Sequence, residues 1–133
     1  MARVRKMLSV RCRRGNVALE YAIVLPALLL FILGIMDGGR LLFTYTTLYR
    51  AAEAAARCAA INNIECGTEV AIQNRGREEA WGLTISPSAF AITTPSCGVQ
   101  VKAVYTFTFI TPGFGIVVPL GSIPLNATAC YPL

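Results

Sequence analysis

The stretch Asn16 to Met36, NVALEYAIVLPALLLFILGIM, decides the fold because it is apolar and long enough to cross a membrane. Val17 to Met36 make 20 residues, which at about 1.5 Å per residue cover the roughly 30 Å hydrocarbon core of a bilayer. Two residues are unusual in such a run. Glu20 places a charge inside it, and Pro26 has no backbone N–H to donate. We therefore predict a transmembrane helix over residues 17–36, with a kink or a melted turn at Pro26.

Positive charge is concentrated ahead of this run. Half of the 12 Lys and Arg residues precede Glu20, and no acidic residue does. They are Arg3, Arg5, Lys6, Arg11, Arg13 and Arg14. By the positive-inside rule, residues 1–15 stay in the cytoplasm and the C-terminal part crosses the membrane. The body beyond the run holds one Lys, Lys102, so the sequence predicts no nucleic-acid partner.

Helical spacing continues past the apolar run, which is longer than a typical signal-peptide core and ends in Asp37-Gly38-Gly39-Arg40 instead of a cleavage site. Apolar residues recur every three or four positions, and polar ones share another face. The apolar set is Leu41, Tyr45, Leu48, Ala52, Ala55 and Ala59, and the polar set is Arg40, Thr44, Thr47, Arg50 and Arg57. Glu53 is spaced to meet Arg50 and Arg57. We predict one helix over residues 16–60, with an Ala-rich end against which a sheet can pack.

After Asn62-Asn63 the pattern changes to that of a small α+β domain, residues 61–133. A short helix is predicted for Val70–Trp81, and strand-like segments lie near Leu83–Ser86 and Phe90–Thr94. Alternation marks a strand over Val99–Ile110, Thr111 to Gly115 is a turn signal, and Leu125–Tyr131 reads as the return strand. The predicted fold is a long N-terminal transmembrane helix packed on a small antiparallel sheet.

Four of the five cysteines fall in the part predicted to be extracytoplasmic, and Cys12 lies in the leader. An even set on the oxidising side of a membrane predicts two disulfides, and four cysteines allow three connectivities. The midpoint between Cys97 and Cys130 falls inside the predicted turn, so a hairpin there favours that pair and leaves Cys58 for Cys66.

Groups that carry catalysis are scarce. The chain has no histidine and no C-x-x-C, which removes Ser-His-Asp catalysis, most zinc sites and thioredoxin-type redox chemistry. Glu78 and Glu79 are adjacent on a predicted helix and read as a solvated face, because catalytic carboxylates must converge across a cleft. The sequence predicts no enzyme and no cofactor or metal.

The order Arg13-Arg14-Gly15, then Asn16 to Tyr21, then an apolar helix resembles the processing site of type IV pilin-like proteins of the tight-adherence (Flp) branch. The run from Val17 to Arg40 is similar more narrowly to TadE-like minor pilins, or pseudopilins, although Gly38 stands where that family often has an aromatic residue. The resemblance implies a bacterial inner-membrane protein with a periplasmic sheet domain. It also implies cleavage by a prepilin peptidase between Gly15 and Asn16, and assembly with other pilins and the pilus platform.

Gly15 and Glu20 each have a simpler explanation than a role in a pilus. Gly15 can merely end the basic leader, and the Glu20 carboxylate is favoured by the helix dipole in a first turn. The resemblance instead assigns Glu20 and Tyr21 to processing and assembly of a pilus for surface attachment. The alternative function is an uncleaved single-span protein whose periplasmic domain binds a partner. The first amino acid of the membrane-extracted protein separates the two.

Overall fold

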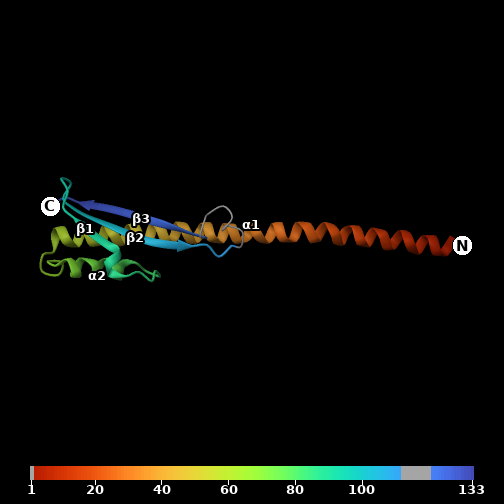
Figure 1. The fold of residues 1–133 in the computed structure, drawn as a ribbon, viewed down its shortest axis with the longest axis horizontal. Helices are drawn as coiled ribbons and strands as arrows, with labels where there is room; N and C mark the ends of the chain where they lie inside the picture. The colour runs from red at the N-terminus through yellow and green to blue at the C-terminus, as the bar shows by residue number, and fades with distance from the viewer. Residues whose placement is uncertain (1, 112–120) are drawn as a thin grey trace.

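The structure is a computed structural model that describes residues 2–111 and 121–133, with only the backbone for residues 2–16. Its elements follow the chain as α1 (Ala2–Ile61), α2 (Glu69–Glu79), the 3-10 turn η1 (Pro87–Ala89) and three strands, β1 (Phe90–Thr93), β2 (Val99–Thr108) and β3 (Ser122–Tyr131). The sheet and α2 cover the C-terminal half of α1, whereas the N-terminal half extends beyond them (Figure 1). This is the predicted α+β, pilin-like arrangement of a long apolar helix on a three-stranded antiparallel sheet.

Helix α1 is longer than predicted at its N-terminus. It begins at Ala2, so the basic leader is helical as well, and it ends at Ile61, close to the predicted Ala60. Pro26 lies inside it, and the α-helix continues on both sides. The melted turn allowed for at Pro26 is therefore not present, because one missing donor does not interrupt a helix that the neighbouring turns maintain.

The predicted short helix is present as α2, shifted by one or two residues. Thr68 caps it, since the Thr68 Oγ1 accepts a hydrogen bond from the Ala71 N–H at 3.3 Å. The strand-like segment predicted at 83–86 is wrong, because these residues form no strand. The chain turns through η1, which has Pro87 in its first turn, and pairing starts only at Phe90. A short apolar run alone did not distinguish strand from coil.

The sheet has the order β1-β2-β3, and both pairs are antiparallel. β3 begins at Ser122, three residues before the predicted start, and includes Pro124 opposite Thr106. A proline is tolerated there because β3 is an edge strand with a free side. Most of the turn predicted at 111–115 lies outside the described residues. The pairing from Thr108↔Ser122 to Val99↔Tyr131 centres on position 115, so the predicted hairpin midpoint between 113 and 114 was slightly wrong.

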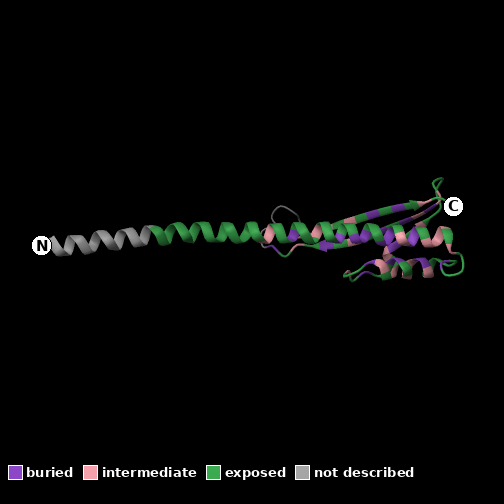
Figure 2. Cartoon of the chain, turned by 180° about the vertical axis from the view of Figure 1, so that it is seen from behind, coloured by how far each residue is buried: buried purple, intermediate pink, exposed green. Residues whose placement is uncertain are grey.

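The core forms where the sheet meets the Ala-rich end of α1 (Figure 2). Small side chains let the strands approach the helix closely, and Phe90 fills the space beneath α2. Buried positions on α1 include Leu48, Ala51, Ala52, Ala55 and Ala56, and those on the sheet include Val101, Ala103, Phe107, Ala127 and Ala129. The predicted apolar face was partly wrong. Thr44 and Thr47 are buried and Tyr45 is 45% exposed, because the sheet covers a face rotated away from Tyr45.

Candidate assembly surface and its anchor

Residues 17–36 of α1 present apolar side chains to the outside on every face. Among the described residues, one helix, Val17–Ile61, is long and apolar enough to cross a membrane, and none of its most apolar 18-residue window is buried. The mean hydropathy of this window is 2.3. Figure 2 shows the exposed stretch continuing up to the start of the sheet domain. A surface of this kind calls for lipid or for other apolar helices, since monomeric soluble proteins rarely expose so large a patch.

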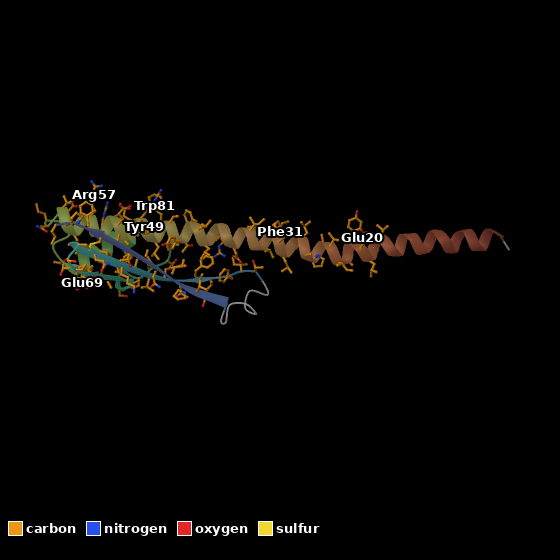
Figure 3. The ribbon with its side chains drawn as sticks, turned by 90° about the horizontal axis from the view of Figure 1, so that it is seen from above. Glu20, Phe31, Tyr49, Arg57, Glu69 and Trp81 are labelled. Carbon is orange, nitrogen blue, oxygen red and sulfur yellow. A yellow bond between two sulfur atoms is a disulfide. The ribbon has the colours of Figure 1, made fainter. Side chains whose placement is uncertain are left out.

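The two residues expected to act in assembly lie on this exposed stretch. Tyr21 is 69% exposed, and Glu20 projects from the helix far from the sheet (Figure 3). Within the described part of the chain, the Glu20 carboxylate takes part in no hydrogen bond or ion pair. Gly15 and Asn16, the predicted cleavage residues, lie in the helical backbone of α1. The fold thus leaves Glu20 available to a partner from another chain.

Asp37 anchors the end of the apolar segment to the sheet domain. Its Oδ2 accepts three hydrogen bonds from the chain that follows β2: from the Thr111 hydroxyl at 2.6 Å, the Thr111 N–H at 2.8 Å and the Ile110 N–H at 3.0 Å. Its Oδ1 accepts one from Nη1 of Arg40 at 2.9 Å. Asp37 is only 2% exposed, so it satisfies the rule that a buried charge must be paired and hydrogen-bonded.

These contacts hold Asp37 in its charged form. The Thr111 hydroxyl lowers the pKa of the Asp37 carboxyl most, followed by the Thr111 N–H, while the Ile110 N–H and Arg40 lower it further and burial opposes them. The Arg40 guanidinium also lies 5.3 Å from the centre of the Phe107 ring, a cation–π contact with β2. One turn of α1 is therefore joined to the end of β2 through two side chains.

Sequence reasoning missed this role for Asp37. The Asp37 to Arg40 segment was recognised only as the end of the apolar run. The one local signal is the spacing of three between an acid and an arginine, which lets them pair on a helix. Thr111 is 74 residues away from Asp37, and no periodicity relates the two.

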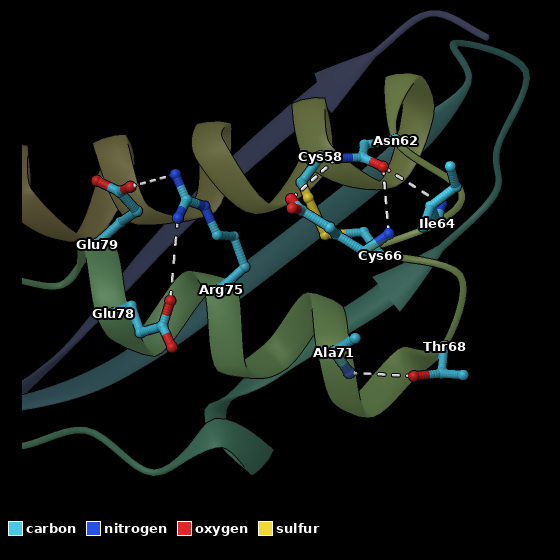
Figure 4. Close-up of a disulfide and its surroundings, with 10 residues drawn as sticks. Cys58, Asn62, Ile64, Cys66, Thr68, Ala71, Arg75, Glu78 and Glu79 are labelled. Atoms are coloured by element: carbon cyan, nitrogen blue, oxygen red, sulfur yellow. Dashed lines mark hydrogen bonds and ion pairs between the residues drawn. A yellow bond between two sulfur atoms is a disulfide. The ribbon is translucent and has the colours of Figure 1, made fainter.

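Two disulfides close the other end of the domain, and they join the cysteines that the sequence favoured. Cys58 bonds Cys66 across the connection between α1 and α2, and Cys97 bonds Cys130 beside the end of the β2-β3 pair. Near the first bridge, the Asn62 side-chain oxygen accepts from the N–H groups of Ile64 and Glu65 and so fixes the turn (Figure 4). The connection leaving α1 is therefore held both covalently and by an Asx turn.

The charged face of α1 differs from the prediction. Among the residues that the structure describes, Glu53 forms no ion pair with Arg50 or Arg57. Besides the Asp37–Arg40 pair of α1, the ion pairs among the described residues lie on α2, where Arg75 contacts Glu79 at 2.7 Å and Glu78 at 3.9 Å (Figure 4). Glu78 and Glu79 thus share one arginine on a helix surface. Across the described residues, no group of three or more acidic or cysteine side chains is placed to hold a metal ion.

Comparison with known proteins gives one match. The sequence model of one protein family, described as TadE-like protein, matches residues 15–57. No curated protein and no solved structure matches the chain. The matched segment runs from the predicted cleavage residue through the exposed apolar half of α1 and the Asp37 anchor to the Ala-rich packing face. Over residues 15–57, about a third of the chain, the sequence is thus similar to the TadE-like protein family.

Proposed function

We propose that this protein is a minor pilin, or pseudopilin, that helps to assemble a tight-adherence type IV pilus used in surface attachment. It would prime, cap or join the filament. The observation that carries the proposal is the exposed apolar stretch of residues 17–36, which projects from a folded domain and carries an acid, Glu20, that forms no ion pair within the described residues. The TadE-like match over this segment supports the tight-adherence setting.

In the proposed topology, residues 17–36 cross the inner membrane, residues 1–15 stay in the cytoplasm and residues 61–133 fold in the periplasm. The basic leader supports this orientation. The disulfides Cys58–Cys66 and Cys97–Cys130 support an oxidising compartment for the domain. A prepilin peptidase would cut between Gly15 and Asn16 and leave residues 16–60 as the mature helix.

Glu20 is proposed to act on a neighbouring subunit. Cleavage frees the amine of Asn16, whose reference pKa of about 7.7 to 8.0 leaves it largely protonated near neutrality. Glu20 lies four residues further on, about 6 Å along the helix. An amine from an axially staggered subunit can offset the desolvation of the Glu20 carboxylate in the apolar layer, and before cleavage no such amine exists. Processing would thereby permit docking, with Tyr21 beside the pair.

A direct test is the N-terminal sequence of the membrane-extracted protein, made together with its cognate peptidase. We expect the mature chain to begin at Asn16 and the Gly15→Val variant to remain full length, because a β-branched residue obstructs the close approach that glycine allows. Gly38→Val is the matched control, since a Cβ at Gly38 meets nothing within 4 Å and should leave cleavage unchanged. Normal maturation of Gly15→Val would show that the cleavage site is wrong.

The second candidate is an uncleaved single-span protein whose periplasmic domain recruits a partner. One observation favours it. The helical backbone of α1 runs unbroken through Gly15 and Asn16, whereas a peptidase needs an extended chain at the bond it cuts. In that case the extracted protein begins at Met1 or Ala2 in the presence of the peptidase, and Glu20 serves the helix dipole alone.

A further inference from the structure

We propose that three exposed apolar residues at the end of the sheet domain nearest the apolar half of α1, namely Ile110, Phe43 and Trp81, rest in the lipid headgroup layer. We name these residues the membrane-proximal rim. In this arrangement the domain leans toward the bilayer on the side of α1 that carries α2. The proposal rests on the membrane insertion of residues 17–36 given above.

Ile110 sets the depth of the rim. Its N–H donates to Oδ2 of Asp37 at 3.0 Å, so its backbone is level with the first residue beyond the predicted span. The Ile110 side chain is nevertheless 67% exposed. At the boundary of the hydrocarbon core such a side chain is removed from water by lipid, which makes its exposure favourable instead of costly.

Phe43 and Trp81 lie further from the span than Ile110, and Figure 3 shows Trp81 beside Tyr49. Phe43 and Trp81 are 59% and 76% exposed. A Cβ at Gly82, the residue after Trp81, would lie 3.8 Å from Cε1 of Phe43, so the loop after α2 rests against this ring. Phe43 and Gly82 also line one groove of about 340 Å³ together with Phe107 of β2. Aromatic side chains therefore gather between α1, the α2 loop and the end of β2.

The positions of Ile110 and Phe43 bring these two residues within reach of the headgroups, whereas Trp81 reaches them only if the domain leans. Phe43 is six residues past Asp37, about 9 Å along the helix, and helical side chains point back toward the N-terminus. Each headgroup layer adds about 5 to 7 Å to the hydrocarbon core. In the view of Figure 1, the end of α2 and the chain after β2 both lie below α1. A tilt of about 20°, common for membrane helices, lowers that side toward the bilayer.

The chemistry of the rim suits an interface better than a deep apolar layer. Tryptophan is enriched where membrane and water meet, because its ring is apolar and its N–H stays hydrated. Arg40 lines the same groove, and its side chain is 44% exposed. Nη1 of its guanidinium pairs with Asp37, and the exposed part of the guanidinium can contact lipid phosphates. A rim of this composition would set the direction in which the domain leans toward the bilayer, as well as its distance from the bilayer.

Trp81 is the only tryptophan, so its fluorescence reports on the rim without labelling. The full chain is reconstituted at low protein density in vesicles of phosphatidylcholine and phosphatidylglycerol, with the acyl chains brominated near their headgroup ends. We expect the Trp81 emission to be shifted to the blue and quenched relative to the same vesicles without bromine. Trp81 emission that is blue-shifted but not quenched would mean that a second copy of the chain covers the rim, and would overturn the proposal.

Two single-tryptophan variants in a Trp81→Phe background separate this inference from membrane insertion itself. Phe31→Trp lies in the predicted span and should be quenched, whereas Ile64→Trp lies at the connection between α1 and α2, is 97% exposed, and should not be. If Phe31→Trp is quenched and Trp81 is not, the rim proposal fails while insertion holds. If neither is quenched, insertion and rim both fail.

A final variant tests whether the rim acts as one surface. Ile110→Ser keeps the Ile110 N–H bonded to Asp37 and removes only the exposed side chain. We expect it to reduce the quenching of Trp81 while both disulfides still form. Unchanged quenching in Ile110→Ser would contradict a lean that depends on Ile110.

Discussion

Replacing Gly76 by alanine tests how closely α2 packs on the sheet. Gly76 is a buried glycine within α2, and the ring of Phe90 lies across it. A Cβ added there would lie 2.8 Å from Cε1, 2.9 Å from Cδ1 and 3.1 Å from Cζ of Phe90. Phe90 is fully buried, so its ring cannot yield without displacing the core around it.

The expected size of the effect is a difference between two terms. Overpacking in a core typically costs about 1 to 3 kcal/mol, whereas alanine in place of a helical glycine gains about 1 kcal/mol. Gly76→Ala should therefore lower the free energy of unfolding by roughly 0 to 2 kcal/mol. Gly39→Ala is the matched control, because it is also helical and a Cβ there meets nothing within 4 Å. It should show the helical gain alone.

The assay is thermal unfolding of the full chain in detergent micelles, followed by near-ultraviolet circular dichroism. For a domain of this size, 1 kcal/mol moves the Tm by about 4 to 8 °C. We expect Gly76→Ala to melt below Gly39→Ala, and the added change Phe90→Leu to cost less in Gly76→Ala than in the native chain. A Tm of Gly76→Ala as high as that of Gly39→Ala would refute the close packing of α2 on Phe90.

Two further predictions concern the anchor and the bridges. Because its pKa is lowered in the folded state, Asp37 contributes stability that is complete above its ordinary value of 3.8 and is lost as the pH falls through the lower folded value. A Tm titration should therefore show less acid destabilisation in Asp37→Asn, and an unchanged titration would contradict the anchor. By loop length, the bridge with a separation of 33 residues should contribute about 4 kcal/mol and that with a separation of 8 about 2.5 kcal/mol. The double variant Cys97→Ser with Cys130→Ser should therefore lower the Tm more than Cys58→Ser with Cys66→Ser. The reverse order would contradict the estimate from loop length.

The features that sequence predicted are those set by local pattern. Helical spacing predicted α1 because the apolar residues of its Ala-rich end recur every three or four positions over several turns. Alternation predicted β2 because every second residue at its start, such as Val101 and Ala103, is buried. The predicted oxidising compartment and the even number of cysteines in it favoured two disulfides. The Cys97–Cys130 pair was reached although the hairpin centre was misplaced, since Cys97 lies beyond the end of β2 where the register no longer constrains it.

The features that sequence did not predict depend on tertiary position. The return strand was predicted to start at Leu125, after Pro124, whereas β3 includes Pro124 because the sheet order places this strand at an edge. Thr44 and Thr47 look polar in a helical pattern but lie under the sheet, because the packing direction is set by the whole domain. The contact between Asp37 and Thr111 likewise needs the complete fold, since β2 must run back along α1 before the two residues meet.

The central claim is that Glu20 binds the freed amine of another pilin, and Glu20→Gln tests it most directly. This change keeps the shape of the side chain and removes its charge. The measurement is the yield of partner pilins that co-purify with the cleaved protein, with Glu53→Gln, an exposed acid on the same helix, as the matched control. We predict that Glu20→Gln inserts, is cleaved and forms both disulfides but loses its partners, whereas Glu53→Gln retains them. Recovery of partner pilins with cleaved Glu20→Gln at the native yield would contradict the charge pair and leave the helix dipole as the reason for Glu20.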